Sequence, residues 1–184
     1  ANIRTRGMDI KAGEIVLEKG RRLQPQDLGL LAMLGAAEMQ VHRQPRIALL
    51  SSGDELVGAD APMEPGKIRD SNSYMLAASI ESAHAQALRL GVARDTRESV
   101  EALFERASSH PVDMIISSAG VSVGAFDFIK EVVESNGRMD FWRVNMRPGK
   151  PLAFGKYLNK QFIGLPGNPV SAFVGFEVFV RPVL

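Results

Sequence analysis

Apolar and polar positions along residues 46–184 follow the pattern of strands that alternate with helices. Residues 47–50 form an unbroken apolar run that ends in Ser51, Ser52 and Gly53, and residues 112–116, apolar except for Asp113, lead in the same way into Ser117 and Ser118. Runs of this kind are typical of strands that are buried on both faces of a parallel sheet. Further strands are predicted over about 87–92, 141–146 and 161–164.

Between these strands the apolar positions recur at helical spacing. A first helix is predicted after residues 70–73, which offer several caps, with Leu76, Ile80 and Ala83 on one face. Others are predicted from Asp95 or Thr96, over 125–135, and from residue 168 onward. This alternation predicts a doubly wound, mostly parallel sheet. Ligands of such sheets bind beyond the carboxyl ends of the strands, so the loops after residues 50, 116 and 164 are the candidate sites.

Residues 1–45 form an appendage in this interpretation, and residues 46–184 form the α/β domain. A short strand is predicted over 14–17 and a helix from about Pro25 to Gly35. This stretch is too short for a core of its own, so its apolar face is expected to rest on another segment. The start at Ala1 and the end directly after an apolar helical pattern indicate a piece of a longer protein.

Composition narrows the function classes. With 45% hydrophobic and 23% charged residues and a net charge of +1, the chain resembles a soluble globular domain without a field that would attract nucleic acid or a membrane. The sequence has no cysteine, which excludes disulfides and zinc-thiolate sites. No leader or membrane-spanning run is evident, so a cytoplasmic protein is expected. Among single residues, His42, His84 and His110 lack metal-ligand spacing, and Phe141 and Trp142 are expected in the core.

Three loops carry candidate chemistry. Residues 117–124 follow a buried strand, are rich in glycine and serine, and open a helix, which suits a phosphate cradle; a tight turn that needs its glycines for positive φ is the alternative. Residues 146–151 hold two cations, Arg147 and Lys150, three positions apart on a backbone fixed by two prolines and a glycine. This arrangement suits a tetrahedral oxyanion, although an ordinary surface turn has the same pattern. Residues 164–171 form a strand-loop-helix junction in which Asn168 caps the helix and Ser171 offers a hydroxyl.

Four carboxylates lie near the predicted strand and helix ends. Asp54 and Glu55 follow the first strand, Asp70 precedes the first helix, and Asp127 falls in the first turn of the third. Carboxylates beside a phosphate cradle hold Mg²⁺ in many proteins. Each of them could instead stabilise a helix N-terminus through the macrodipole.

Taken together, the loops resemble one family, the molybdopterin molybdenumtransferases of the bacterial MoeA type, also found as the E domain of gephyrin. Residues 1–45 resemble the stretch that precedes this domain in the family. The matching motifs occur in the family's order: Ser51-Ser52-Gly53-Asp54-Glu55-Leu56, Ile68-Arg69-Asp70-Ser71-Asn72, Ser117-Ser118-Ala119-Gly120-Val121-Ser122-Val123-Gly124, Arg147-Pro148-Gly149-Lys150-Pro151 and Gly164-Leu165-Pro166-Gly167-Asn168-Pro169-Val170-Ser171-Ala172.

The resemblance implies a fold and a reaction. The fold is a three-layer α/β/α sandwich, shared with molybdopterin adenylyltransferases. The reaction takes adenylylated molybdopterin and molybdate, cleaves the adenylate and leaves molybdenum on the dithiolene. By position, the catalytic residues are Asp54, Glu55 and Asp127, and the Mg²⁺ ligands are Asp54, Glu55 and Asp70. The molybdopterin and molybdate contacts fall to Ser118, Gly120, Ser122, Gly124, Asn72, Arg147, Lys150, Pro151, Gly167, Asn168 and Ser171.

Two alternatives stay open at this point: a molybdopterin adenylyltransferase, which would need ATP, and a non-catalytic pterin-binding or scaffolding domain. The family pattern has glycine where this chain has Ala119, and lysine where it has Arg147. Full-length relatives carry further domains and form homodimers, so this chain is expected to bind its ligands and to require the rest of the protein for turnover.

Overall fold

The computed structural model describes residues 3–118 and 125–184, and the side chains of residues 125–127 lie outside that description. The chain divides into two compact units, Ala1–His42 and Arg43–Leu184. Each unit is described by itself.

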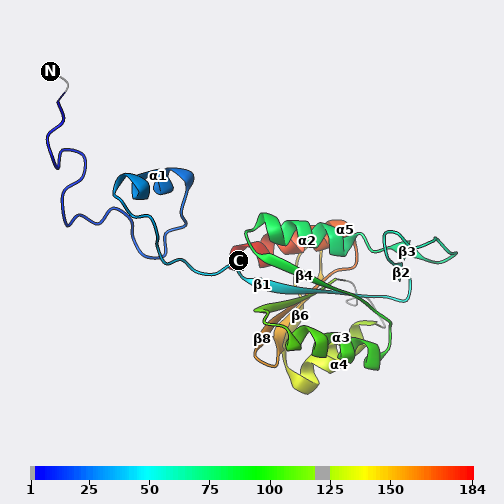
Figure 1. Cartoon of the computed structure of the whole chain (residues 1–184). Coiled ribbons are helices and arrows are strands. Elements are labelled where there is room, and N and C mark those ends of the chain that lie inside the picture. Colours follow the sequence, from blue (N-terminus) through cyan, green and yellow to red (C-terminus); the bar gives the residue numbers. More distant parts are fainter. Residues whose placement is uncertain (1–2, 119–124) are drawn as a thin grey trace. The chain divides into compact units, whose positions relative to one another are not determined.

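The larger unit is built on a six-stranded sheet with the order β4-β1-β5-β8-β7-β6 (Figure 1). The first four strands in that order run parallel, whereas β7 and β6 join as antiparallel neighbours. Their bounds are β1 (Arg46–Ser52), β4 (Gln86–Ala93), β5 (Met114–Ser118), β6 (Gly137–Arg143), β7 (Pro151–Tyr157) and β8 (Lys160–Leu165). A separate parallel pair, β2 (Leu56–Val57) and β3 (Ile68–Arg69), forms in the segment between β1 and α2.

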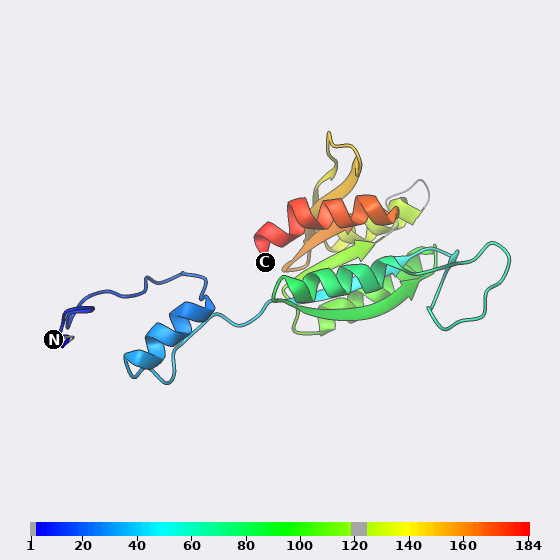
Figure 2. The same cartoon turned by 90° about the horizontal axis from the view of Figure 1, so that it is seen from above.

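Helices cover both faces of this sheet (Figures 1 and 2). On one face lie α2 (Asn72–Ser82) and α5 (Pro169–Gly175), the latter continued by the π-helical turn Phe176–Val180 and the 3-10 turn Arg181–Val183. On the other face lie α3 (Arg97–Ser109) and α4 (Ala125–Asn136). The predicted α/β sandwich with a mostly parallel sheet is therefore confirmed.

The core forms two layers because successive strand residues point to opposite faces. In β1, Ile47 and Leu49 pack with α2 and α5, whereas Ala48 and Leu50 pack with α3 and α4. The same alternation carries Ser51 to the α2/α5 face and Ser52 to the α3/α4 face. In β5, Met114 and Ile116 pack on the α2/α5 face and Ile115 on the other, which places Ser118 and Ser117 on the α2/α5 and α3/α4 faces respectively.

Several sequence predictions were wrong in detail. Residues 14–17 form no strand, and Ile15 is 80% exposed, because the segment has no partner strand among the described residues of its unit. The strand predicted over 141–146 is β6, which begins earlier, and β7 was missed because Pro151 and Gly155 are unusual in strands. Phe141 and Trp142 are not core residues: they are 38% and 40% exposed, because β6 is an edge strand.

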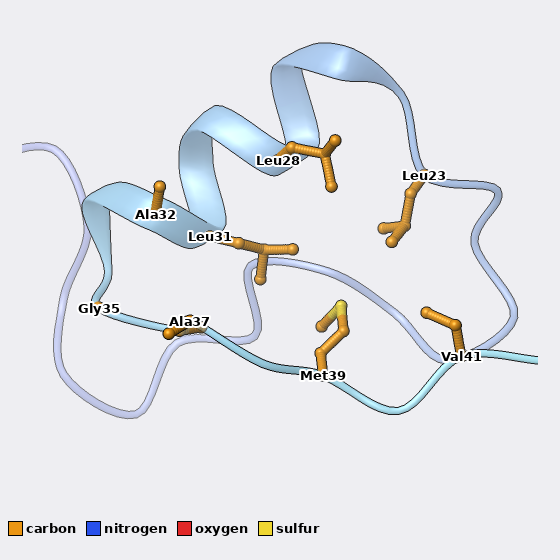
Figure 3. Close-up of a pocket in the computed structure, with 9 residues that line it drawn as sticks. Leu23, Leu28, Leu31, Ala32, Gly35, Ala37, Met39 and Val41 are labelled. Carbon is orange, nitrogen blue, oxygen red and sulfur yellow. The ribbon is translucent and has the colours of Figure 1, made fainter.

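In the smaller unit, α1 (Pro25–Met33) begins at a well-capped N-terminus. Asp27, which is 4% exposed, accepts hydrogen bonds from the guanidinium of Arg21 and from the Gln24 amide, and the Arg21 bonds are the main reason that its pKa is lowered. The apolar side of the helix lines an open hollow of about 520 Å³ (Figure 3). Its walls include Leu23, Leu28, Leu31, Met39 and Val41. That this apolar face rests on another segment stays a prediction.

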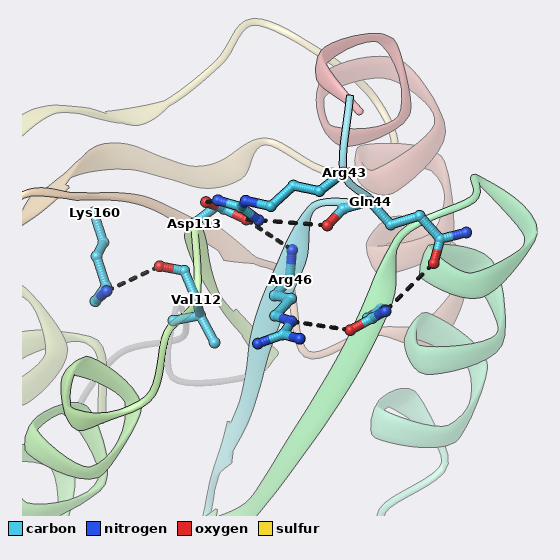
Figure 4. A network of polar contacts seen from close by, with 7 residues as sticks. Arg43, Gln44, Arg46, Val112, Asp113 and Lys160 are labelled. Atoms are coloured by element: carbon cyan, nitrogen blue, oxygen red, sulfur yellow. Dashed lines mark hydrogen bonds and ion pairs between the residues drawn. The ribbon is translucent and has the colours of Figure 1, made fainter. Parts of the chain in front are cut away.

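At the amino ends of the parallel strands, Asp113 organises a polar network (Figure 4). Its carboxylate accepts hydrogen bonds from both terminal nitrogens of Arg43, one of them at 2.7 Å, and from the Arg46 amide at 2.9 Å. These bonds, the Arg43 bonds foremost, lower the pKa of Asp113 to about 2. The network ties the segment that enters β1 to the start of β5, at the edge of the sheet opposite the candidate site.

Asp113→Asn is expected to destabilise the protein in a pH-dependent way. The folded pKa lies below the ordinary value of 3.8, so the contribution is present above that pH and disappears as the pH falls toward 2. The Asp113 side chain is 38% exposed, so solvent screening reduces the effect to about 1 kcal/mol at neutral pH. Urea unfolding of both proteins at neutral pH and at about pH 2 measures the difference. An equal difference at both pH values would contradict the assignment.

His84 ends α2 in a left-handed conformation, with φ of 62°. The residue is exposed, and a left-handed position at a helix end favours glycine. His84→Gly is therefore expected to raise the free energy of unfolding by about 0.5 kcal/mol. Ala78→Gly, at an exposed position inside the same helix, should lower it by about 1 kcal/mol. Thermal or urea unfolding of both variants tests the opposite signs.

Candidate functional site

The carboxyl ends of the parallel strands meet at one edge of the sheet. Ser51 of β1 is the register partner of Ser118 of β5, which is in turn the partner of Leu165 of β8. On the other side of β1, Ser52 pairs with Ala93 of β4. The segments that follow these strands therefore emerge side by side, as the sequence predicted for its candidate loops.

Asp70 lies buried at this edge. It is 6% exposed, and its Oδ2 accepts a hydrogen bond of 3.0 Å from the Ser51 hydroxyl. Its Oδ1 accepts one of 3.1 Å from the Ser73 amide, in the first turn of α2. Asp70 therefore fixes the start of α2 above the end of β1, and both of its oxygens already accept a hydrogen bond within the protein.

Asn72 connects α2 with the loop after β8. Its amide nitrogen donates a 2.8 Å hydrogen bond to the Gly167 carbonyl, and the residue is 7% exposed. Because β5 lies between β1 and β8, this bond spans the end of β5, where Ser118 lies. The Asn72 Oδ1 and the Ser118 hydroxyl are both buried and have no hydrogen-bond partner. The structure thus brings four of the predicted residues, Asp70, Asn72, Ser118 and Gly167, to one place.

The cation-bearing loop comes next to the start of α5. Asn168 caps this helix, since its Oδ1 accepts hydrogen bonds from the Ser171 amide at 3.1 Å and the Ser171 hydroxyl at 3.3 Å. Gly149, with φ of 100°, lies beside this helix start: a Cβ there would be in ordinary van der Waals contact with the Ser171 carbonyl oxygen, at 3.6 Å, and only 2.9 Å from the Met146 methyl group. The Lys150 carbonyl accepts a 3.0 Å hydrogen bond from the Val144 amide, which closes the loop. Arg147, Lys150 and Pro151 are exposed here.

Asp54 and Glu55 lie on the β4 side of the edge, with a third carboxylate that the sequence did not single out. The amide of Asp54 approaches the Asp95 carboxylate at 3.4 Å, and the amide of Asp95 approaches the Asp54 carboxylate at 3.3 Å. Burial is the main reason that the pKa of Asp95 is raised, and the nearby charges of Asp54 and Glu55 raise it further. Asp95 was interpreted only as a possible helix cap, a role that Thr96 performs by accepting from the Ser99 amide.

The Mg²⁺ expectation finds no support in the geometry. Across the side chains that the structure describes, no three histidine or carboxylate groups gather as a metal site would need. Asp70 instead lies with Ser51 on the α2/α5 face, apart from the pair formed by Asp54 and Asp95. The side chain of Asp127 and residues Gly120, Ser122 and Gly124 lie outside the described residues, so their predicted roles stay predictions.

Ser51 is the main residue of the candidate site that sequence reasoning missed. It was quoted within a motif but given no role, although its place two residues after Leu49 puts it on the α2/α5 face. That alternation was the available signal. The neighbouring Ser52 and Ser117 point to the α3/α4 face and line a small cavity there with Phe104 and Ile129.

Comparisons with known proteins identify the family. A family model described as a probable molybdopterin binding domain matches residues 48–184, and one described as the MoeA N-terminal region (domain I and II) matches residues 1–35. A molybdopterin molybdenumtransferase from Haemophilus influenzae is 45% identical over 183 residues, which are 100% of this chain and 45% of that protein. The chain thus spans about half the length of the curated relatives it matches.

Solved structures give the same result. The molybdopterin biosynthesis MoeA protein from Pyrococcus horikosii aligns with a TM-score of 0.85 at 33% identity, over 96% of this chain and 44% of that one. The molybdopterin biosynthesis enzyme MoaB from Thermus thermophilus aligns with a TM-score of 0.59 at 17% identity, over 77% of this chain and 92% of that one, a likeness of fold alone. No helix among the described residues is long and apolar enough to span a bilayer.

Proposed function

Because the chain belongs to the family of molybdopterin-binding domains, we propose that it forms the substrate-binding part of a molybdopterin molybdenumtransferase. The intact protein would take adenylylated molybdopterin and molybdate, release AMP and leave molybdenum on the dithiolene. The observation that carries this proposal is the similarity, over the whole of this chain, to curated molybdenumtransferases, at 45% and 40% identity. It extends through residues 1–35, which match a region specific to the MoeA type rather than to the binding fold in general.

Both substrates are proposed to bind at this edge of the sheet. The loop that carries Arg147 and Lys150 is closed by the Val144–Lys150 hydrogen bond, and its Gly149 contacts Ser171 at the N-terminal end of α5. Fixed cations beside such a helix end suit a tetrahedral oxyanion such as molybdate. On the opposite side of the edge, Asp54 and Glu55 are proposed to act in cleavage of the adenylate. Asp127, Gly120, Ser122 and Gly124 keep their proposed roles in hydrolysis and in phosphate binding.

The proposed reaction assigns no role to Mg²⁺, because the carboxylates that the structure describes do not gather into a site for it. A homodimer of the full-length protein and a cytoplasmic location are likewise predictions. Both follow from the family and composition arguments rather than from contacts in this chain.

The proposal is tested with the intact parent protein. Purified full-length protein, supplied with adenylylated molybdopterin and molybdate, should release AMP and form the molybdenum cofactor in a molybdate-dependent way. Absence of both products would reject the activity. Formation of adenylylated molybdopterin from molybdopterin and ATP would instead identify an adenylyltransferase. A Lys150→Ala variant of the same protein should form less cofactor at limiting molybdate.

A further inference from the structure

The buried groups on the α2/α5 face of the site are mostly hydrogen-bond acceptors. Ser51 donates its only hydroxyl hydrogen to Asp70, so its oxygen can only accept from a ligand. The Asn72 amide orientation is fixed by the Gly167 carbonyl, because the flipped amide would set two oxygens against each other. Asn72 therefore offers its unpartnered Oδ1. We name these groups, together with Asp70 and Ser118, the acceptor pocket.

The pocket is compact because the sheet register brings its members together. Ser51 and Ser118 are register partners on neighbouring strands and point to the same face. Asp70 bonds to Ser51, and the Asn72 side chain passes from α2 to Gly167 beyond β8. The Asn72 Oδ1 and the Ser118 hydroxyl are at least nine-tenths buried as residues and lack partners. Buried polar groups without partners are costly, and a bound ligand is one physical reason to retain them.

This inventory determines which ligand chemistry fits. The side-chain donors that remain in the acceptor pocket are the Ser118 O–H and the second Nδ2 hydrogen of Asn72, and the Asp70 carboxylate repels an incoming anion. A phosphate or molybdate oxyanion would therefore find too few donors there. Molybdate belongs by the cation loop and Ser171, and the phosphate by the cradle proposed for Gly120, Ser122 and Gly124, while the acceptor pocket suits a neutral group rich in N–H donors.

We propose that the acceptor pocket binds the 2-amino-4-oxo edge of a pterin ring. That edge presents N–H donors on its amino group and on ring nitrogen N3, which match Asp70, Asn72 and Ser51. Its 4-oxo oxygen is an acceptor for the Ser118 hydroxyl. The inference rests on the proposed function. It goes further because it gives Asp70 a role in ring recognition instead of metal binding. It also orients the substrate, with its pterin ring in the acceptor pocket.

The test measures binding of ring and anion separately to the full chain. Calorimetric titrations use pterin, the analogue 4-oxopteridine, which lacks the 2-amino group, and inorganic pyrophosphate. The analogue should bind about tenfold or more weakly than pterin, because it leaves buried acceptors unpaired. Ser118→Ala and Asn72→Ala should each weaken pterin binding about tenfold and leave pyrophosphate binding unchanged.

Ser117→Ala is the matched control. Ser117 adjoins Ser118, is equally buried at 1% exposure and also lacks a partner, yet it points to the opposite face. Its removal should not alter pterin affinity, and circular dichroism should show that all three variants fold. Equal binding of pterin and 4-oxopteridine, or an equal effect of the two serine variants, would overturn the inference. Pyrophosphate binding without pterin binding would overturn it while the proposed function stands, and binding of neither would overturn both.

Discussion

Gly155→Ala is expected to lower the free energy of unfolding by about 3 kcal/mol, because the added Cβ would meet a backbone atom that cannot rotate away. A Cβ on Gly155 would lie 2.3 Å from the Arg138 carbonyl oxygen, across the β6–β7 pair. Gly137, on the facing strand, is equally confined, with the Lys156 carbonyl oxygen 2.0 Å from its Cβ position. The two backbones therefore approach more closely than any side chain permits.

The effect should reach the site as well as the fold. β6 and β7 are joined by the loop that carries Arg147 and Lys150, so loss of their pairing would release both cations. Urea unfolding and molybdate titration of Gly155→Ala measure the two consequences. Gly29→Ala is the control, because nothing lies within 4 Å of its Cβ position in α1 and alanine favours a helix. A Gly155→Ala protein as stable as the unsubstituted chain would contradict the close approach of the β6 and β7 backbones at Gly155.

Lys150→Ala is expected to weaken molybdate binding about tenfold to a hundredfold, the usual effect of removing one charged partner from an oxyanion. Lys150 directly follows Gly149, whose Cβ position lies 3.6 Å from the Ser171 carbonyl oxygen, and its own backbone is fixed by Val144. The loop is therefore held in place before the anion arrives, which lowers the cost of binding. Calorimetric titration of the full-length protein with molybdate measures the loss.

A second lysine provides the control for charge alone. Lys156 lies near the other end of β7, so Lys156→Ala removes the same charge far from the proposed oxyanion site. Lys156→Ala should change molybdate affinity by less than about twofold. Equal losses from the two variants would mean that the anion responds to overall charge. Lys150→Arg should retain part of the affinity, because the charge stays while the geometry changes.

The fold could be predicted where a residue's environment follows from its immediate neighbours. β1 and β5 were evident because unbroken apolar runs indicate strands buried on both faces. β7 was not, because its Pro151 and Gly155 are breakers in isolation and acceptable only where a neighbouring strand needs close approach. Phe141 and Trp142 were assigned to the core because strand order, which makes β6 an edge, is set by long-range pairing.

The same limit applies to the site. Lys150 could be proposed as a ligand contact from its rigid, cationic loop, and Asn72 and Gly167 from their motifs' resemblance to those of the family. The grouping of Asp70 with Ser51 could not, since it depends on α2 starting above the end of β1. The approach of Asp95 to Asp54 could not be predicted either, because these residues lie 41 positions apart and are brought together by the β1–β4 pairing.

The most direct test of the account is a crystal structure of the full chain soaked with molybdate and a pterin nucleotide. The anomalous signal of molybdenum is expected beside Lys150 and Ser171, with the pterin edge against Asn72 and Ser118. Molybdenum or pterin bound at the opposite edge of the sheet, near Arg43 and Asp113, would contradict it.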